Sequence, residues 1–148
     1  MNLYVETSAV TAWLLEEERG HTARSRLAEA DAVHTSDLTL IECDRALRRA
    51  LEAGRITADQ SLLLQALVDT ASAHWTLHAI DAEVVHRSRR SFPCEPVRAL
   101  DAIHLATAFV VRSLRPDVRI LSFDRRVRDN AASLGFASLP DEGAAVES

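Results

Sequence analysis

The sequence predicts an α/β protein, a three-layer α/β/α domain with a central, mainly parallel sheet. Short apolar runs alternate along the chain with longer segments of helical period, the pattern of strands joined by crossover helices. The length of 148 residues and the hydrophobic content of 47% suit one domain with a proper core. We expect that domain over residues 1–140. Residues 141–148 are acidic, lack large hydrophobic side chains and are expected to form a disordered tail.

The first half of the chain is expected to contain two strands and three helices. Residues 2–5, NLYV, and residues 32–35, AVHT, are short apolar runs that fit buried strands. A helix is expected from Thr7 to Glu18. Residues 35–54 begin with capping residues and end at a glycine, and residues 57–73 begin with a capping threonine, so both segments are predicted helices.

The second half continues this alternation. Residues 74–80 are expected to be a short strand or extended link, and residues 81–91 a helix that ends before a proline. Residues 99–113 are apolar around nearly the whole helical circumference, which predicts an inner helix. Residues 117–123 form the last predicted strand, and residues 124–136 the last helix.

Composition excludes several enzyme classes. All 17 basic residues are arginine, whereas phosphate-loop NTPases, Schiff-base enzymes and phosphoacceptor domains need a lysine. The 4 glycines form no nucleotide-binding loop, and no serine lies in a G-x-S-x-G turn. The net charge of -5 does not favour a protein that coats nucleic acid in general.

The location expected from the sequence is the cytoplasm. Cys43 and Cys94 are far apart and match no metal or redox spacing, so reduced thiols are expected. No apolar run approaches the roughly 18 residues of a membrane span, and no secretion signal is recognisable at the N-terminus. No membrane partner is therefore expected.

Four acidic residues lie where strands end or helices begin. Glu6 ends the first strand and Asp124 follows the last, while Glu42 and Asp101 fall early in two predicted helices. Open parallel sheets bind ligands at the carboxyl ends of their strands. Each acid also has a structural explanation, which is helix capping for Glu6 and Asp124, compensation of the helix dipole for Asp101, and a solvated ion-pair stripe for Glu42.

Four carboxylates gathered at one sheet edge would repel one another unless a cation lay between them. Mg²⁺ takes carboxylates, waters and substrate phosphate oxygens as ligands. Such a site suits phosphodiester hydrolysis, in which the metal generates hydroxide and neutralises charge during an in-line displacement. The pattern makes a metal-dependent phosphodiesterase one hypothesis for this chain.

Four segments resemble the acidic motifs of PIN-domain ribonucleases, in order and with suitable separation. They are YVETSAV, TSDLTLIECDRAL, VRALDAIHLATA and ILSFDRRVRDNAASLGF. The resemblance covers essentially the whole chain and is closest to the VapC toxins of bacterial toxin–antitoxin modules. It implies a PIN-like fold and a Mg²⁺- or Mn²⁺-dependent endoribonuclease. It also implies a homodimer and a cognate antitoxin whose C-terminal segment covers the acidic cleft.

The resemblance also implies the roles of individual residues. The implied catalytic and metal-binding acids are Glu6, Glu42, Asp101 and Asp124. Ser122 matches a hydroxyl that would help to hold the site. Arg98 would orient carboxylates or contact phosphate, and a surface arginine ahead of a helix is the alternative for this residue.

The first motif departs from the family, which normally has aspartate at the position of Glu6. Glutamate keeps the charge but extends the carboxylate by about 1.5 Å, whereas Mg²⁺ demands nearly ideal oxygen geometry. Three explanations stay open, namely a natural variant adjusted elsewhere, a natural inactive relative, and an engineered substitution that tames a toxin. Our hypothesis is that metal binding survives and that catalysis is reduced.

Other functions and other residues complete the sequence-based expectations. A catalytically inactive PIN-like protein that binds RNA or a partner, and a nuclease that acts on DNA, are the alternative functions. His104 is expected to be a buried structural histidine rather than a ligand or base, and Trp13 and Trp75 are expected to pack in the core or a dimer interface. Three arginine clusters are expected to be mostly solvated, and the one after Asp124 is placed to meet RNA phosphates. They are Arg45, Arg48 and Arg49; Arg87, Arg89 and Arg90; and Arg125, Arg126 and Arg128.

Overall fold

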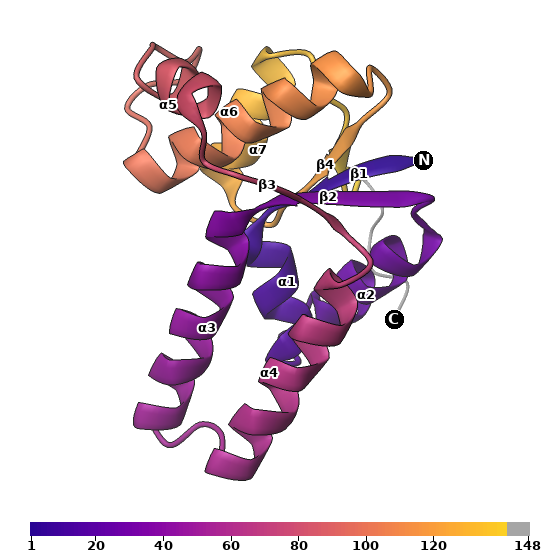
Figure 1. The fold of residues 1–148 in the computed structure, drawn as a ribbon, viewed down its shortest axis with the longest axis vertical. Coiled ribbons are helices and arrows are strands. Elements are labelled where there is room, and N and C mark those ends of the chain that lie inside the picture. The colour runs from indigo at the N-terminus through magenta and orange to yellow at the C-terminus, as the bar shows by residue number, and fades with distance from the viewer. Residues whose placement is uncertain (142–148) are drawn as a thin grey trace.

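The computed structural model describes residues 1–141, so the expected tail lies outside the described residues except for its first residue. Strands and helices alternate through this part of the chain (Figure 1). The strands are β1 (Asn2–Val5), β2 (Ala32–Ser36), β3 (Thr76–His78), β4 (Arg119–Leu121) and β5 (Ser138–Leu139). The helices are α1 (Thr7–Leu14), α2 (Gly20–Glu29), α3 (Asp37–Glu52), α4 (Ala58–Ser72), α5 (Ala82–Ser88), α6 (Ala99–Leu114) and α7 (Arg125–Ser133).

The sheet has the order β3-β2-β1-β4-β5, and all its neighbouring strands are parallel. In Figure 1, α1 to α4 lie on one side of the sheet and α5 to α7 on the other. The three-layer α/β/α prediction is therefore confirmed. Because the strands are parallel, their carboxyl ends meet at one edge of the sheet, and the segments that follow β1, β2 and β4 start there.

Alternation along β1 divides the core into two clusters. Leu3 and Val5 pack with apolar side chains of α1 to α4, whereas Tyr4 packs with those of α6 and α7. Successive side chains of a strand point to opposite faces, so one short buried strand serves both layers. Trp13 and Trp75 are partly buried against the first cluster, as the sequence predicts.

The N-terminal helical region differs from the prediction. The first helix ends at Leu14 rather than Glu18, because Glu16 takes a φ of 52° that no helix contains. The chain then starts α2, which the sequence did not predict. A Cβ on Gly20 would lie 2.3 Å from the carbonyl oxygen of Ala12, so only glycine permits this close packing of α2 on α1.

Three smaller differences concern the rest of the fold. The short strand β5 was not predicted, and α5 ends at Ser88 rather than at residue 91. The helix α6 is less completely buried than its composition suggests, because Leu100, Phe109 and Leu114 are exposed. No helix within residues 1–141 is long and apolar enough to cross a membrane.

Two histidines meet across strands β2 and β3. His34 Nδ1 and His78 Nε2 lie 3.1 Å apart, and His34 Nε2 is buried without a hydrogen-bond partner in the described part of the chain. Burial lowers the pKa of His34, and the charges of His78 and Arg115 lower it further. Burial also lowers the pKa of His78, and it outweighs the opposing effect of Asp37 and Asp81.

This pair predicts a loss of stability in mild acid. A histidine whose pKa is lowered by folding binds protons more readily in the unfolded chain than in the folded one. Its contribution to the free energy of unfolding is therefore fully present above its ordinary pKa of 6.5 and is lost as the pH falls below that value. The free energy of unfolding, measured by urea titration, should fall between pH 7.5 and pH 5.5. His34→Phe should flatten this dependence, and His86→Gln, an exposed control on α5, should not. Equal slopes in the two variants would contradict the assignment.

Candidate active site

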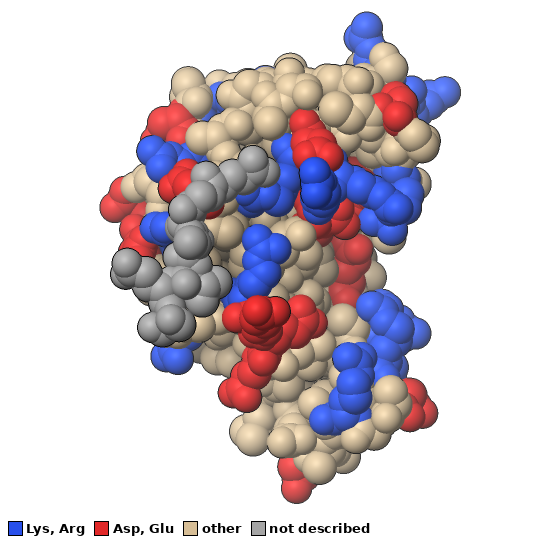
Figure 2. Space-filling view, turned by 180° about the vertical axis from the view of Figure 1, so that it is seen from behind, with Lys and Arg blue, Asp and Glu red and all other residues tan. Residues whose placement is uncertain are grey.

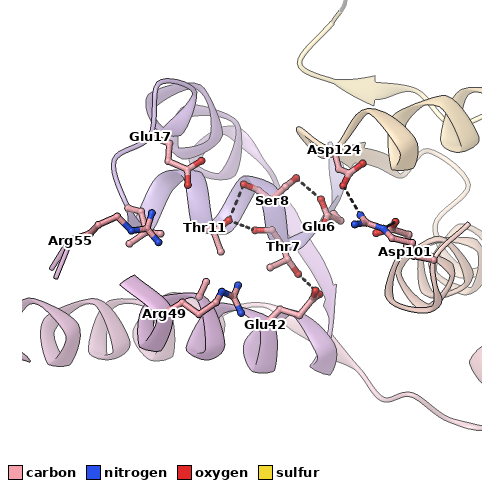
Figure 3. Close-up of a pocket in the computed structure, with 13 residues that line it drawn as sticks. Glu6, Thr7, Ser8, Thr11, Glu17, Glu42, Arg49, Arg55, Asp101 and Asp124 are labelled. Atoms are coloured by element: carbon pink, nitrogen blue, oxygen red, sulfur yellow. Dashed lines mark hydrogen bonds and ion pairs between the residues drawn. The ribbon is translucent and has the colours of Figure 1, made fainter. Parts of the chain in front are cut away.

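The carboxyl edge of the sheet opens into a cleft of about 280 Å³ (Figure 3). Side chains from the ends of β1 and β4, from α1 and α3, and from the start of α6 line it. The lining includes all four acids and the arginine singled out in the sequence, namely Glu6, Glu42, Asp101, Asp124 and Arg98. Residues far apart in the sequence thus converge here, as the order of the strands requires.

Glu6 lies directly after β1, where its backbone N–H donates to the carbonyl of Leu121 at 3.0 Å. Its side chain makes no capping hydrogen bond to α1, so the helix-capping alternative for Glu6 is not what the structure shows. Instead, Glu6 Oε2 accepts hydrogen bonds from the hydroxyls of Ser8 and of Ser122, the latter at 2.8 Å. Ser122 is fully buried, and its hydroxyl holds one oxygen of Glu6.

The two serines are themselves fixed by the backbone. Ser8 Oγ accepts the N–H of Phe123 at 2.8 Å, and Ser122 Oγ accepts the N–H of Asp124 at 3.1 Å. The bond to Ser8 ties the start of α1 to the segment after β4, and the bond to Ser122 lies within that segment. The hydroxyls of Ser8 and Ser122 form a serine cradle around Glu6. Backbone N–H groups hold these hydroxyls in place, so they do not rotate freely.

Glu42 is half-buried, and its contacts differ from the solvated ion-pair stripe considered for it. Glu42 Oε1 accepts hydrogen bonds from Thr7 Oγ1 at 2.7 Å and His104 Nε2 at 2.6 Å. Partial burial alone would raise the pKa of Glu42, but these hydrogen bonds, with the charges of His104 and Arg49, lower it. The carboxylate is therefore held ionised and in one orientation.

Behind Glu42 lies a buried polar chain that sequence reasoning did not identify. The other ring nitrogen of His104, Nδ1, lies 2.9 Å from the hydroxyl of Tyr4. Burial raises the pKa of Tyr4 well above its ordinary value, and the charges of Glu6 and Glu42 raise it further. Tyr4 therefore stays protonated, and His104 links its hydroxyl to the carboxylate of Glu42 through the two ring nitrogens. His104 is buried and structural, as expected, but its role is to position an acid of the cleft.

Asp101 and Asp124 share one arginine. Arg98 Nε donates to Asp101 Oδ2 at 2.9 Å, and Arg98 Nη2 donates to Asp124 Oδ2 at 3.3 Å. Asp124 also caps α7, because its Oδ1 accepts the backbone N–H of Arg126 at 2.8 Å. The capping alternative for Asp124 thus holds alongside its place in the cleft. Arg98 orients carboxylates, which is one of the two roles considered for it.

Three of the four acids keep one carboxylate oxygen without a hydrogen-bond partner in the described chain, whereas both oxygens of Asp124 accept hydrogen bonds. Within residues 1–141, no hydrogen bond reaches Glu6 Oε1, Glu42 Oε2 or Asp101 Oδ1. Such oxygens are hard donors of the kind that Mg²⁺ and Mn²⁺ take. In the described chain no three acids or histidines already surround one point as ligands, and Arg98 lies between Asp101 and Asp124. The chemistry of these donors fits a hard divalent cation. The carboxylates would have to move closer together to coordinate one ion.

The arginine clusters separate into structural and cleft-lining members. Arg128 donates to the carbonyl oxygens of Ser122, Leu139 and Pro140, so this member of the last cluster holds β5 in place rather than facing the cleft. The guanidinium of Arg87 lies 4.3 Å from the ring centre of Phe92. Among the arginines of the three clusters, Arg49 on α3 is the one that lines the cleft.

Comparison with known proteins agrees with this geometry. The sequence model of the PIN domain matches residues 3–133. Ribonuclease VapC35 of Mycobacterium tuberculosis is 31% identical over 137 residues, which cover 91% of this chain and 93% of the relative. The structure of M. tuberculosis VapC20, described as a Sarcin-Ricin loop cleaving toxin, has a TM-score of 0.62 at 19% identity and covers 91% of this chain and 96% of that one.

A second solved structure extends the likeness of fold. A chain of VapBC2 from Rickettsia felis, bound to a DNA fragment from their promoter, has a TM-score of 0.61 at 8% identity. The match covers 93% of this chain and 97% of that one. The family match spans nearly the whole described chain and includes all four acids of the cleft. This chain therefore belongs to the PIN-domain family.

Proposed function

We propose that this chain is a metal-dependent endoribonuclease that acts as the toxin of a toxin–antitoxin module. The observation that supports it most is the convergence of Glu6, Glu42, Asp101 and Asp124 in one cleft at the carboxyl edge of the sheet. A relative 31% identical over most of the chain is named a ribonuclease, which favours RNA as the substrate class.

In this proposal, the acids would share one task. Glu6, Glu42, Asp101 and Asp124 would hold Mg²⁺ or Mn²⁺, and Arg98, which now pairs with Asp101 and Asp124, would contact a substrate phosphate. A cation in such a site supplies Lewis acidity that activates water and neutralises the charge developing on the phosphate. The serine cradle and the hydrogen bonds to Glu42 hold the carboxylates against mutual repulsion.

A second candidate function is an inactive PIN-like protein that binds RNA or a partner through the same cleft. Two observations favour it. Glu6 is one methylene longer than the family's aspartate, and the Arg98 guanidinium occupies the space between Asp101 and Asp124. Binding of RNA without metal-dependent cleavage, in a chain shown to be folded, would support this candidate over the first.

We also propose a cognate antitoxin and a homodimer as partners. Leu62, Leu63 and Leu67 of α4 are exposed, and they offer apolar surface for an antitoxin segment. Phe109 and Leu114 expose apolar surface on α6, on the opposite side of the sheet, which suits pairing of two copies. Light scattering on the chain alone tests the dimer, since a monomeric mass at working concentration would exclude it.

The expected cytoplasmic location and single functional unit over residues 1–140 stand as further parts of the proposal. Cys43 and Cys94 are free thiols in the structure. Burial raises the pKa of Cys43 to about 12, and the charges of Glu42, Asp44 and Glu6 act in the same direction. Cys43 is therefore a poor nucleophile that packs in the core. Thiol titration of freshly prepared protein tests whether both cysteines remain reduced.

The test of the proposed function is cleavage of total RNA by the purified chain with Mg²⁺, with Mn²⁺ and with chelator. We expect cleavage that requires a divalent cation and stops when chelator is added. Single-stranded DNA of matched length is included as a competing substrate, and RNA should be cut in preference. Cleavage that continues in chelator would contradict a metal-dependent mechanism, and preferred cleavage of DNA would contradict the substrate class.

A further inference from the structure

The cleft extends beyond the acids to two arginines that neither the proposed chemistry nor the family motifs use. Arg49 and Arg55 line the same cleft as Glu42 and Asp101. Figure 3 shows Arg55 at one end of the cleft, Asp101 and Asp124 at the other, and Arg49 between Arg55 and Glu42. The space-filling view shows acidic surface in a hollow at one edge of the molecule, with arginine surface on either side of it (Figure 2). The arginines that form no ion pair with an acid of the described chain therefore lie away from Asp101 and Asp124, whereas Arg98 pairs with both of those acids.

The helix α3 sets the position of Arg49. Glu42, Ala46 and Arg49 all line the cleft, and their spacing of four and then three residues places them on one helical face. Seven residues separate Glu42 from Arg49, which is about 10 Å along a helix that rises 1.5 Å per residue. The small side chain of Ala46 lies between them and leaves this stretch open. The backbone of Arg49 thus lies about two helical turns from that of Glu42.

Arg55 is fixed by the way in which α3 ends. Gly54 takes a φ of 71°, and a residue other than glycine is strained in that conformation. The N–H of Gly54 donates to the carbonyl of Leu51 at 3.0 Å, and the N–H of Arg55 donates to that of Ala50 at 2.9 Å. This pair of bonds closes the helix and reverses the chain, so Arg55 returns along the cleft instead of continuing away from it.

Both guanidinium groups are available for an anionic ligand. Within residues 1–141, neither Arg49 nor Arg55 has a carboxylate within 4.0 Å, although Glu17 lines the same end of the cleft. The charge of Arg49 does reach Glu42, whose pKa it helps to lower. An arginine presents a planar set of donors that matches phosphate oxygens, and it remains charged at any working pH.

We infer that Arg49 and Arg55 form a phosphate-binding subsite for the RNA strand on one side of the scissile phosphate. The inference rests on the proposed function for the identity of the ligand. An acidic cleft repels a polyanion, so the strand needs positive contacts at a fixed distance from the cleaved bond. A site two helical turns away would bind phosphates beyond the reacting one. The length of RNA required for tight binding should therefore depend on these two residues.

The experiment compares the double variant Arg49→Ala/Arg55→Ala with Arg45→Ala/Arg48→Ala. The control removes the same charge from exposed positions of α3 that do not line the cleft. Each pair is made in an Asp101→Asn chain, so that binding of labelled single-stranded RNA is measured without cleavage. The oligonucleotides range from a trinucleotide to about twelve nucleotides, and each is measured at several salt concentrations. Circular dichroism verifies folding.

With the longer RNAs, the Arg49/Arg55 pair should bind at least about tenfold more weakly than the control, because each charge-assisted contact to phosphate contributes a factor of that order. The slope of log affinity against log salt should be shallower by about 1.4, or roughly 0.7 for each lost phosphate contact. The two pairs should bind the trinucleotide equally. Equal affinities and equal slopes at every length would overturn the inference.

Failure of the proposed function would look different. In that case the chain with Asp101 intact would not cleave RNA with any metal, while the binding comparison would still report on Arg49 and Arg55. A length-dependent loss of binding in a chain that never cleaves would keep the subsite and remove the nuclease. Cleavage that is normal in the chain with Asp101 intact, with equal binding by the two arginine pairs, would keep the nuclease and remove the subsite.

Discussion

Asp101→Asn is expected to abolish metal-dependent RNA cleavage while leaving the chain folded. The substitution keeps the shape of the side chain, and its amide oxygen can still accept a hydrogen bond from Arg98, but the negative charge and the free carboxylate oxygen are lost. Asp101 is only 7% exposed, so water cannot fully replace that charge. The metal supplies several kcal/mol of charge stabilisation in such reactions, so the rate should fall on the order of 10²- to 10⁴-fold.

The measurement is the initial rate of cleavage of a labelled RNA with saturating Mn²⁺, together with calorimetric titration of Mn²⁺ and a thermal melt. Asp69→Asn, at an exposed position of α4 outside the cleft, is the matched control and should cleave normally. Because both variants are purified identically, a contaminating nuclease would give equal rates in the two samples. Undiminished cleavage by Asp101→Asn would remove Asp101 from the site.

The main features of the fold could be predicted because they depend on local sequence. Apolar runs of four or five residues indicated the strands β1 and β2, and capping residues indicated the helix α3. Ser36 caps α3 as expected, because its hydroxyl oxygen accepts the N–H of Leu38 at 3.1 Å. The helix α2 could not be predicted in the same way. Only Gly20 and Ala23 of its residues are buried, and no side chain caps it, so it lacks both an apolar stripe and a start signal.

The sequence made the convergence of the acids possible without establishing it, since parallel strands place their carboxyl ends together but Glu42 and Asp101 lie in helices. What surrounds each acid could not be predicted, because those contacts join distant segments. The bond between His104 and Glu42 spans 62 residues, and that between Ser122 and Glu6 spans 116. The alternating pattern of residues 2–5 gives no sign that the hydroxyl of Tyr4 hydrogen-bonds to His104, which in turn contacts Glu42 in the cleft. The helical face of Glu42 suggested arginine neighbours, whereas packing of α6 brought a histidine to it.

Glu6→Asp is expected to raise the cleavage rate, by up to about 100-fold, because in the proposed site the extra methylene would displace the carboxylate by more than 1 Å. Mg²⁺ demands nearly ideal oxygen positions, so a displaced ligand would still bind the cation but would hold it less favourably for the reaction. Mn²⁺ affinity should therefore change little between the two forms while the rate changes strongly. Rates and Mn²⁺ affinities of both forms, measured side by side with the same RNA, separate the two effects.

Glu42→Asp is the matched control, since it makes the same chemical change at the second acid and should have the opposite effect. Shortening Glu42 would draw its carboxylate away from His104 Nε2 and Thr7 Oγ1, which now lie 2.6 and 2.7 Å from it, so cleavage should fall. The serine cradle supports the alternative that the site is naturally adjusted to glutamate, because the fixed hydroxyls of Ser8 and Ser122 already hold the longer side chain. If the unchanged chain cleaves RNA well and Glu6→Asp brings no gain, that cradle has adapted the site to glutamate, and the hypothesis of a restrained enzyme is wrong. A gain at Glu6 with a loss at Glu42 would show that the reach of the first carboxylate, rather than its charge, limits the rate.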